Sequence, residues 1–281
     1  MISALNCIVC GGAVARQWPA VVSPFVALRV WARKPFSLRL FECSVCGHRF
    51  YSERLESREQ MALYCGYRNR AYQEQRESVE PIYTAEFNAA LSAPAHMQER
   101  RDMIASILWS HIPVSPKVLD FGGDGSLVLG MFPLMGIASY DIGGAGPTLG
   151  ACQRLNPDVV VCSNVLEHVA FPRVTLNEIA SICTSDTVAF IEVPIEDPLA
   201  WPVLRKRMAQ YWRLLCARPR VALSLLHPGM LWSMHEHVSF FSLTSFRRLT
   251  VGWREIASGG YTLKSGGSMM WFLGKRGEAC A

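Results

Sequence analysis

The feature that most limits how this chain can fold is a short apolar strand that runs directly into a glycine-rich loop, VLDFGGDG at residues 118–125. The strand reaches Asp120, and glycine occupies three of the five positions after it: Gly122, Gly123 and Gly125. Glycine has no Cβ, so its backbone can turn sharply and can lie close to another molecule. The pattern predicts a strand-to-loop turn with a ligand at the carboxyl end of the strand.

Strand and helix patterns alternate through the segment that contains this loop. Strand-like apolar runs occur at residues 117–121, 136–142, 158–164 and 187–194, with helix-like segments at 126–134 and 171–183. Alternation of this kind is typical of an α/β domain whose mostly parallel sheet is covered by helices on both faces. The predicted fold class is therefore α/β and Rossmann-like.

The spacing after the strand separates two kinds of nucleotide ligand. A dinucleotide fingerprint, G-x-G-x-x-G counted from Gly123, would need a third glycine where Val128 stands, which disfavours NAD. Asp141 closes the next strand 21 positions after Asp120 (141 minus 120), where an acidic side chain can accept hydrogen bonds from both ribose hydroxyls of an adenosine. Together these features favour a nucleoside ligand. The alternative is a plain tight turn followed by a solvated aspartate.

Four of the ten cysteines form two CxxCG sequences, CIVCG and CSVCG. A CxxC turn lets two thiolates reach one metal ion, and the following glycine relieves the turn. Two such turns complete a tetrahedral shell of sulfur ligands that suits a structural zinc ion and leaves no open position for catalysis. The predicted zinc ligands are Cys7, Cys10, Cys43 and Cys46, and the alternative is four reduced cysteines in a core.

These patterns divide the chain into three predicted parts. Residues 1–52 form a zinc ribbon, residues 53–94 a helical linker, and residues 95–281 an α/β domain with a lid insertion near 197–233. The first residues lack the basic start and apolar stretch of a signal peptide, and no apolar run approaches the roughly 20 residues that span a bilayer. We therefore expect a cytoplasmic protein.

In this order, the motifs resemble those of class I S-adenosylmethionine-dependent methyltransferases. In that family a strand ends in an acidic residue before a glycine loop, as in VLDFGGDGS, and a second acidic residue closes the next strand, as in ASYDIGG. The segments VVVCSNVLEHV, AFIEVP and HEHVSFFSLTSFRRL are similar to later parts of the family's domain, so the resemblance covers residues 95–281. It implies S-adenosylmethionine as the cofactor, bound by Asp120, Gly122, Gly123, Gly125, Asp141 and Asn164.

Two departures from the family pattern are visible. The glycine loop is one residue shorter than the family's loop, and only a brief segment separates Asp141 from Asp158. The family's third strand is therefore expected to be reduced or missing, together with the acidic residue that commonly holds the adenine amine. The amino-terminal ribbon is also similar to that of bacterial methyltransferases of sugar and surface-glycan pathways, including sugar C-methyltransferases.

Methyl transfer to a hydroxyl or to an enolisable carbon needs a base, and histidine suits this task. The two leading candidates are His237, in HEHV, and His168, in VLEHV, with His235 below both. Glu236 can orient or tune an imidazole, and the Glu236–His237 pair matches a Glu-His pair that sugar C-methyltransferases use near the acceptor. A structural role is the alternative for each histidine.

The lid insertion is rich in basic residues. They offer contacts to phosphate groups of a nucleotide sugar or a lipid-linked glycan, or to an anionic membrane surface, and a solvated helix face is the alternative. These residues are Arg205, Lys206, Arg207, Arg213, Arg218 and Arg220. The formal net charge of +5 agrees with each interpretation and decides between none of them.

We therefore expect an S-adenosylmethionine-dependent methyltransferase that acts on a sugar, a nucleotide sugar or a glycan precursor in surface polysaccharide or secondary metabolite biosynthesis. Nucleic acid is not the expected partner, and the basic lid allows peripheral contact with the inner face of the membrane. A nucleic-acid-modifying methyltransferase and a catalytically silent binding protein are the alternatives. The sequence leaves open whether oxygen, nitrogen or carbon receives the methyl group.

Overall fold

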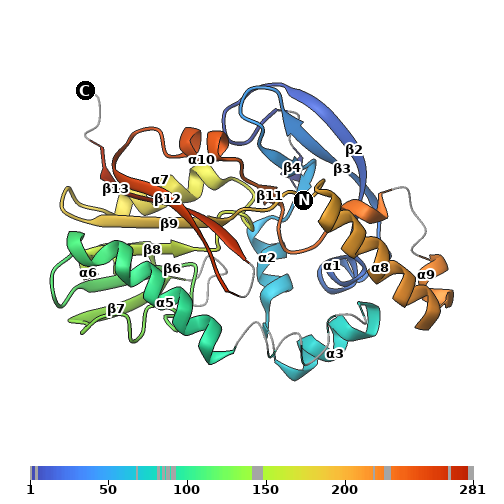
Figure 1. Cartoon of the computed structure of the whole chain (residues 1–281), viewed down its shortest axis with the longest axis horizontal. Coiled ribbons are helices and arrows are strands. Elements are labelled where there is room, and N and C mark those ends of the chain that lie inside the picture. The colour runs from blue at the N-terminus through green and yellow to red at the C-terminus, as the bar shows by residue number, and fades with distance from the viewer. Residues whose placement is uncertain are drawn as a thin grey trace. The chain divides into compact units, whose positions relative to one another are not determined.

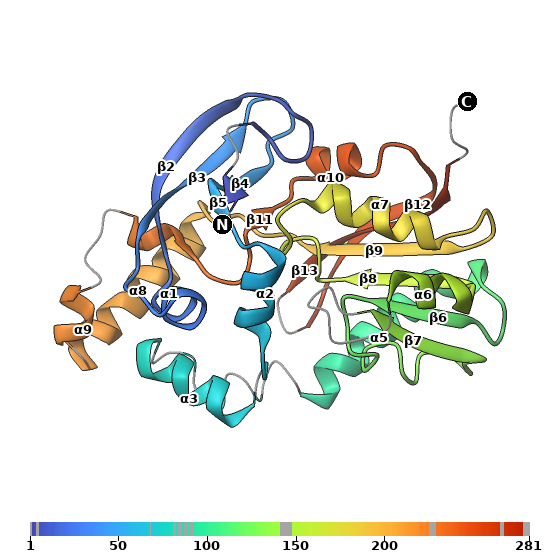
Figure 2. The ribbon, with the colours of Figure 1, turned by 180° about the vertical axis from the view of Figure 1, so that it is seen from behind.

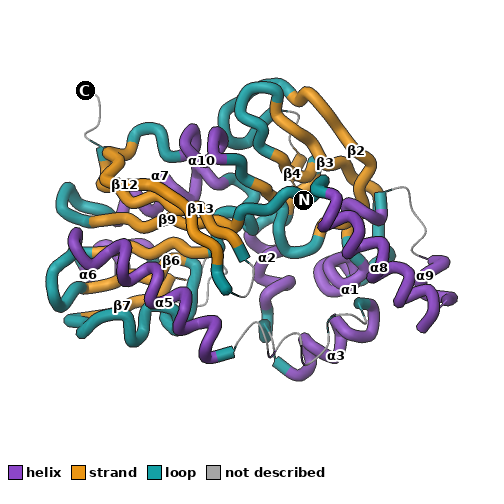
Figure 3. The backbone as a smooth tube through the Cα atoms, viewed as in Figure 1, coloured by secondary structure: helices purple, strands orange, loops and turns teal. Residues whose placement is uncertain are grey.

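The computed structural model of the chain describes residues 2–3, 6–67, 69–80, 83, 86, 89, 93–140, 148–217, 219–224, 229–264 and 267–277. The chain divides into two compact units (Figure 1). The first unit comprises residues 1–7, 11–92 and 196–240, and the second comprises residues 8–10, 93–195 and 241–281. Both units contain helices and strands (Figure 3), so the mixed α/β class predicted from the sequence is confirmed.

The second unit is built on a six-stranded sheet with the order β12-β13-β9-β8-β6-β7. Its strands are β6 (Lys117–Phe121), β7 (Gly136–Tyr140), β8 (Val159–Ser163), β9 (Val188–Pro194), β12 (Trp253–Thr262) and β13 (Ser268–Arg276). Strands β7, β6, β8 and β9 pair in parallel, and β13 pairs antiparallel with β9 and with β12. The carboxyl ends of the four parallel strands therefore meet at one edge of the sheet.

Helices cover both faces of this sheet. They are α5 (Pro94–Leu108), η1 (Trp109–His111), α6 (Leu149–Leu155), α7 (Pro172–Ile182) and α10 (Leu243–Leu249). Helix α5 lies on one face, whereas α6 and α7 lie on the other (Figures 1 and 2). Ile104 and Leu108 of α5 are fully buried in a core with Val118 and Val159. Because β8 is covered on both faces, its residues 159–162 are apolar and fully buried.

Three details of this unit bear on the sequence predictions. Within the described residues no strand lies beyond β7, but residues 141–147 are not among them, so the expected reduction or loss of the third strand stays a prediction. The helix expected at 126–134 is wrong, because these residues form turns: Gly130 has a φ of 83°, and Pro133 has no backbone N–H to donate. Asp141 lies outside the described residues, as does the rest of 141–147.

The first unit contains a five-stranded sheet with the order β10-β2-β3-β4-β11, and a separate pair of β1 with β5. The strands are β1 (Ile2–Ser3), β2 (Val14–Val22), β3 (Ser37–Cys43), β4 (Arg49–Tyr51), β5 (Glu53–Arg54), β10 (Ser233–Met234) and β11 (Ser239–Phe240). The two edge strands, β10 and β11, lie at and just after the end of the predicted lid insertion (197–233). Strand β10 pairs with β2, and β11 pairs with β4. The residues between them, 235–238, therefore connect the two edges of the sheet.

Helices pack around this sheet. They are α1 (Pro24–Trp31), α2 (Ser57–Tyr64), α3 (Arg70–Val79), α8 (Trp201–Ala217), α9 (Pro219–Ser224) and η2 (Met230–Trp232). The core of the unit includes Phe25, Leu40, Tyr51, Leu63 and Tyr72, all fully buried. The domain boundaries expected at 52 and 94 stay a prediction. Among the described helices of the chain, none is both long and apolar enough to cross a membrane.

Candidate functional site

The glycine loop after β6 is held by its own aspartate. Oδ2 of the buried Asp120 accepts a hydrogen bond from the Gly125 N–H at 2.8 Å. The Gly122 N–H donates to the carbonyl of Tyr140, at the end of β7, over 2.6 Å. The loop is therefore tied to the ends of two parallel strands, which is where α/β sheets bind ligands.

Two of the loop glycines leave no space for a side chain. Gly122 has a φ of 84°, and a Cβ there would lie 2.5 Å from Cγ2 of Val165. A Cβ on Gly123 would lie 2.2 Å from Oδ2 of Asp120. Gly125 has a φ of 82° and a more open surrounding. The structure thus brings the predicted aspartate and all three predicted glycines together in one crowded turn.

The carboxyl group of Asp120 is a weaker acid than usual. Burial raises its pKa from 3.8 to about 6, and the charge of Asp124 adds to the rise, whereas the bond from the Gly125 N–H opposes it. A nearby positive charge would favour the ionised carboxylate. Asp120 therefore suits the neighbourhood of a cationic ligand.

A cavity of about 330 Å³ opens beside this loop. Its walls are Asp124, Gly125 and Leu129, together with Ile137, Ala138 and Ser139 of β7. Small-molecule sites typically measure about 300 to 1,000 Å³. The space beside the loop is therefore large enough for part of a nucleoside.

Asn164 follows β8 in a strained conformation. Its φ is 55°, in the left-handed region that is uncommon for residues other than glycine. Its Oδ1 is buried and has no hydrogen-bond partner among the described residues. Strained residues and buried polar atoms without partners concentrate at functional sites. This Oδ1 is therefore available to a bound ligand, which supports the prediction that Asn164 binds the cofactor.

A buried polar network that the sequence analysis missed lies at the ends of β8 and β9. Glu192 is fully buried and accepts hydrogen bonds from Arg100 at 2.6 Å and from Ser163 at 2.5 Å. Its second oxygen accepts from the Tyr261 hydroxyl at 2.5 Å. Burial, and then the charge of Glu192, raise the pKa of Tyr261, so its hydroxyl stays a donor. A carboxylate inside the apolar run AFIEVP was the available signal.

His168 also lies beyond the end of β8. Its Nε2 is 3.8 Å from Oε1 of Glu167, a residue that is almost completely buried. The His168 N–H donates to the carbonyl of Val165 at 3.0 Å, which closes the turn between them. The second unit thus gathers Asn164 and His168 in the segment that follows one strand.

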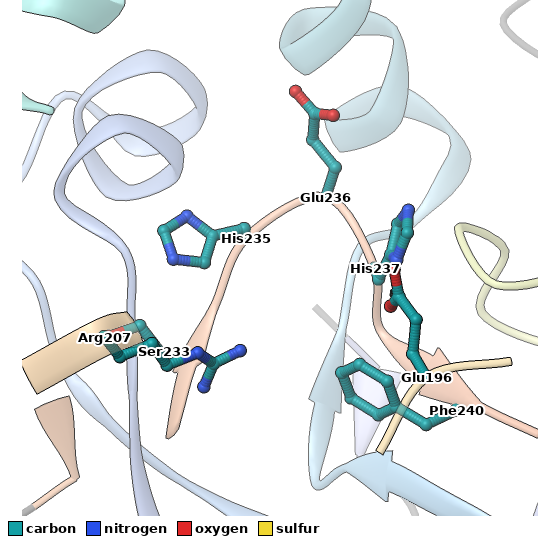
Figure 4. A pocket seen from close by; sticks show the side chains of 7 residues that line it. All are labelled: Glu196, Arg207, Ser233, His235, Glu236, His237 and Phe240. Atoms are coloured by element: carbon teal, nitrogen blue, oxygen red, sulfur yellow. Dashed lines mark hydrogen bonds and ion pairs between the residues drawn. The ribbon is translucent and has the colours of Figure 1, made fainter. Parts of the chain in front are cut away.

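A second cavity, of about 230 Å³, lies within the first unit (Figure 4). Its walls are Glu196, Arg207, Ser233, His235, Glu236, His237 and Phe240. The pairing of β10 and β11 with the sheet fixes both ends of the segment 235–238. Two of the three predicted catalytic residues, Glu236 and His237, therefore line one pocket.

His237 is paired with a carboxylate that the sequence analysis did not single out. Its Nδ1 lies 2.7 Å from Oε2 of Glu196. A carboxylate at Nδ1 fixes the orientation of an imidazole and favours the tautomer whose basic lone pair is on Nε2. The pair is partly open to solvent, with exposed side-chain fractions of 31% for His237 and 43% for Glu196. The Glu196 carboxylate therefore fixes the orientation of the His237 ring.

Glu236 points away from its neighbour His237 (Figure 4). Its Oε1 accepts a hydrogen bond from the Tyr72 hydroxyl at 2.8 Å and lies 2.5 Å from Nη1 of Arg76. Both partners belong to α3. Glu236 is thus fixed to a helix of the predicted linker.

The same helix end also holds His235. Nδ1 of His235 lies 3.2 Å from Oε1 of Glu80, whose other oxygen is 3.1 Å from Nε of Arg76. Burial would raise the pKa of Glu80, but His235 and then Arg76 lower it to about 2. The carboxylate of Glu80 is therefore ionised and pairs with basic groups on two segments.

The four predicted zinc ligands form a cluster. They are Cys7, Cys10, Cys43 and Cys46, and their Sγ atoms all lie within 4.8 Å of one another. The Sγ atoms of Cys7 and Cys46 are 3.6 Å apart, close to the roughly 3.8 Å expected for two thiolates on a tetrahedral zinc ion. Hydrogen bonds from the Gly11 N–H to the Cys7 carbonyl and from the Cys7 N–H to the Gly12 carbonyl close the first knuckle. The donor set fits a structural zinc ion.

Solved structures of methyltransferases resemble this chain at low identity. One is 1,6-didemethyltoxoflavin-N1-methyltransferase of Burkholderia thailandensis with bound 1,6-didemethyltoxoflavin and S-adenosylhomocysteine, at 12% identity and a TM-score of 0.47, covering 86% of this chain and 96% of that chain. Another is human N-acetylserotonin methyltransferase in complex with S-adenosylmethionine, at 14% identity and a TM-score of 0.41, covering 90% and 81%. Likenesses this weak do not identify an acceptor.

A family model described as a methyltransferase domain gives the stronger finding. It matches residues 94–250, which is more than half of the 281-residue chain. No curated protein matches the chain. The matched region contains the glycine loop, Asn164 and His168 of the second unit. The chain therefore belongs to the methyltransferase-domain family and is an S-adenosylmethionine-dependent methyltransferase.

Proposed function

We propose that this methyltransferase acts on a small-molecule acceptor that is a sugar, a nucleotide sugar or a glycan precursor. The observation that carries the proposal is the pocket in which Glu196, Arg207, His237 and Phe240 meet. Convergent polar side chains suit an acceptor rich in hydroxyl groups, and a single aromatic ring suits the apolar face of a sugar ring. The resemblance of the ribbon to that of sugar and surface-glycan methyltransferases supports the same class of acceptor.

S-adenosylmethionine supplies an electrophilic methyl group when it is bound. In the proposed site the crowded glycines let the backbone lie against the cofactor, and Asp120 places a carboxylate in the same turn. Oδ1 of Asn164 would accept a hydrogen bond from the cofactor, since it has no partner among the described residues. Asp141 holds the ribose, as the family resemblance implies.

His237 is the proposed base. It takes the proton of the acceptor at Nε2, while Glu196 at Nδ1 stabilises the imidazolium that forms. Glu236 acts as a positioning residue, because Arg76 and Tyr72 hold it to α3. His168 is the second candidate for the base.

We further propose that the four-cysteine cluster holds a structural zinc ion and that the protein works in the cytoplasm. A reducing compartment such as the cytoplasm keeps thiolates available to a metal ion. The zinc would join the two knuckles and leave no open coordination position.

The test combines calorimetry with turnover. The wild-type protein should bind S-adenosylmethionine and S-adenosylhomocysteine, and mass spectrometry should detect a methylated product when nucleotide sugars are supplied. His237→Ala should lower turnover by about 100-fold with little change in cofactor affinity, because a general base acts in the transition state. His111→Ala, at an exposed position in η1, is the matched control and should keep wild-type turnover.

Three results would count against the proposal. A wild-type protein that binds neither the cofactor nor its demethylated product would be a catalytically silent relative. Near-normal turnover in His237→Ala would move the base to His168, whereas a joint loss of melting temperature and cofactor affinity would mark His237 as structural.

A further inference from the structure

Arg207 of α8 projects into the pocket of the first unit from the side that carries His235, opposite Phe240 (Figure 4). Its Nη1 donates a hydrogen bond to the carbonyl of Leu231 at 2.5 Å. A guanidinium carries five N–H donors, so this bond leaves others for a ligand. The backbone contact fixes the group at the wall of the cavity.

The carboxylates around this pocket each have a basic partner other than Arg207. Glu196 lies against His237, and Glu236 lies against Arg76. Glu80, behind His235, lies against both His235 and Arg76. In the part of the chain that the structure describes, no carboxylate forms an ion pair with Arg207. No described carboxylate therefore lies within ion-pair distance of this guanidinium, although Glu196 and Glu236 line the same pocket.

The other basic residues of the lid do not share this position. Arg205, Lys206 and Arg213 lie on the same helix, are exposed, and are not among the residues that line the pocket. Arg218 and the side chain of Arg220 lie outside what the structure describes. Of the basic lid residues whose side chains are described, Arg207 alone faces the cavity.

We propose that Arg207 binds a phosphate group of the acceptor, so that the pocket selects a phosphorylated sugar or a nucleotide sugar over a neutral one. This inference rests on the proposed function and narrows its acceptor class. The fork of a guanidinium matches the geometry of phosphate oxygens, and a weakly hydrated guanidinium is well suited to such an ion pair. The geometry places this contact at the wall opposite Phe240.

The size of the cavity limits which part of the acceptor it receives. At about 230 Å³ it is smaller than the roughly 300 to 1,000 Å³ of sites that enclose a whole drug-sized ligand. It therefore receives a phosphate and the ring next to it, and the remainder of a larger acceptor extends outward. Phe240 and the His237–Glu196 pair then face that ring.

The test measures binding to the full-length protein by calorimetry with three probes: inorganic pyrophosphate, UDP and uncharged uridine. Pyrophosphate and UDP should bind, and uridine should bind at least tenfold more weakly than UDP. Arg207→Gln should weaken the binding of both charged probes at least tenfold. Arg207→Lys should give an intermediate loss, because it keeps the charge and removes the fork. Arg213→Gln, which removes an exposed arginine from the same helix, should leave both affinities at the wild-type level.

Several outcomes would overturn the assignment. Equal affinities in Arg207→Gln and the wild type would do so, and so would an equal loss in Arg213→Gln, which would mean non-specific attraction by the lid. Binding to vesicles that contain phosphatidylglycerol without binding to UDP would mean that Arg207 contacts an anionic membrane surface instead of an acceptor phosphate. The melting temperatures of the Arg207→Gln and Arg213→Gln proteins distinguish a loss of phosphate binding from a loss of folding.

Turnover and binding measurements together distinguish a wrong phosphate subsite from a wrong proposed function. If a methylated product forms and Arg207→Gln keeps the wild-type KM for a phosphorylated acceptor, the phosphate subsite is wrong and the methyltransferase proposal stands. If pyrophosphate binds through Arg207 and no sugar-based acceptor is methylated, the proposed acceptor class is wrong and only an anion site remains.

Discussion

Nη1 of Arg76 lies 2.5 Å from Oε1 of Glu236, and this ion pair joins α3 to the segment that carries His235 and His237. Both side chains are mostly buried, with exposed fractions of 11% and 16%. The guanidinium of Arg76 also lies 3.8 Å from the centroid of the Tyr83 ring. The position of the pocket wall therefore depends on a helix that lies more than 150 residues earlier in the chain.

Arg76→Gln should destabilise the first unit. The change leaves the Glu236 carboxylate without its cationic partner in a mostly buried position, and breaking such a pair costs about 3 kcal/mol. The measurement is the free energy of unfolding in urea, together with the KM of an acceptor once one is known. We expect a loss of stability and a raised KM.

Arg70→Gln is the matched control, because Arg70 forms an ion pair with Glu74 on the same helix but is almost fully exposed. An exposed pair of this kind contributes little. The melting temperature of this variant should match that of the wild type. An Arg76→Gln protein as stable as Arg70→Gln would show that the buried pair does not hold the segment.

Zinc occupancy should depend on the knuckle cysteines. Cys43→Ser removes one of four sulfur ligands, so zinc per chain should fall well below one and the melting temperature should drop. Elemental analysis of the purified protein gives the occupancy. Cys65→Ser changes an exposed cysteine outside the cluster and should keep full occupancy. Wild-type protein without zinc, or Cys43→Ser with unchanged zinc, would contradict the assignment.

Much of this structure could be predicted from local sequence patterns. The strands β6, β8 and β9 were predictable because buried parallel strands are continuous apolar runs, such as VVVC at 159–162. The cysteine cluster was predictable because its ligands come in two fixed spacings. The turn after β6 was predictable because only glycine tolerates the φ of 84° at Gly122 and the contact with Val165.

The pocket of the first unit could not be predicted in the same way. Strands β10 and β11 have two residues each, which is too short for any periodic pattern, and they pair with β2 and β4 far away in the sequence. Glu196 follows a strand as an ordinary polar residue, and nothing local separates Arg207 from the other basic residues of α8. Only the long-range strand pairing brings such residues to one cavity.

Gly122→Ala should damage both folding and cofactor binding. A φ of 84° costs a residue with a Cβ about 1 to 2 kcal/mol, and the contact at 2.5 Å with the Val165 side chain adds overpacking. We expect a loss of about 3 kcal/mol in the free energy of unfolding and at least a tenfold weaker affinity for S-adenosylmethionine. Urea unfolding and calorimetry measure the two effects.

Gly130→Ala separates backbone strain from crowding. Gly130 has nearly the same φ, 83°, but a Cβ there would meet nothing within 4 Å. This variant should lose only about 1 to 2 kcal/mol and should keep the wild-type cofactor affinity. Equal effects of the two substitutions on cofactor affinity would contradict the close approach of a ligand at Gly122.

The stability of the second unit should fall as the pH rises from about 4 to 6, and Asp120 should be the cause. Its pKa of about 6 in the folded protein exceeds its ordinary value of 3.8, so between these values the folded state binds more protons than the unfolded state. The stability from the protonated carboxyl is complete below pH 4 and is lost as the pH passes 6. Two pKa units correspond to roughly 3 kcal/mol.

Asp120→Asn keeps an oxygen that can accept a hydrogen bond from the Gly125 N–H but cannot ionise, so this variant should lack that decline in stability. The difference between the two urea-unfolding curves, measured from pH 4 to 7.5, isolates the contribution of Asp120. Asp186→Asn, which removes an exposed carboxylate from the same unit, should follow the wild-type curve. A difference between wild type and Asp120→Asn that stays constant with pH would show that the buried carboxyl titrates at its ordinary value.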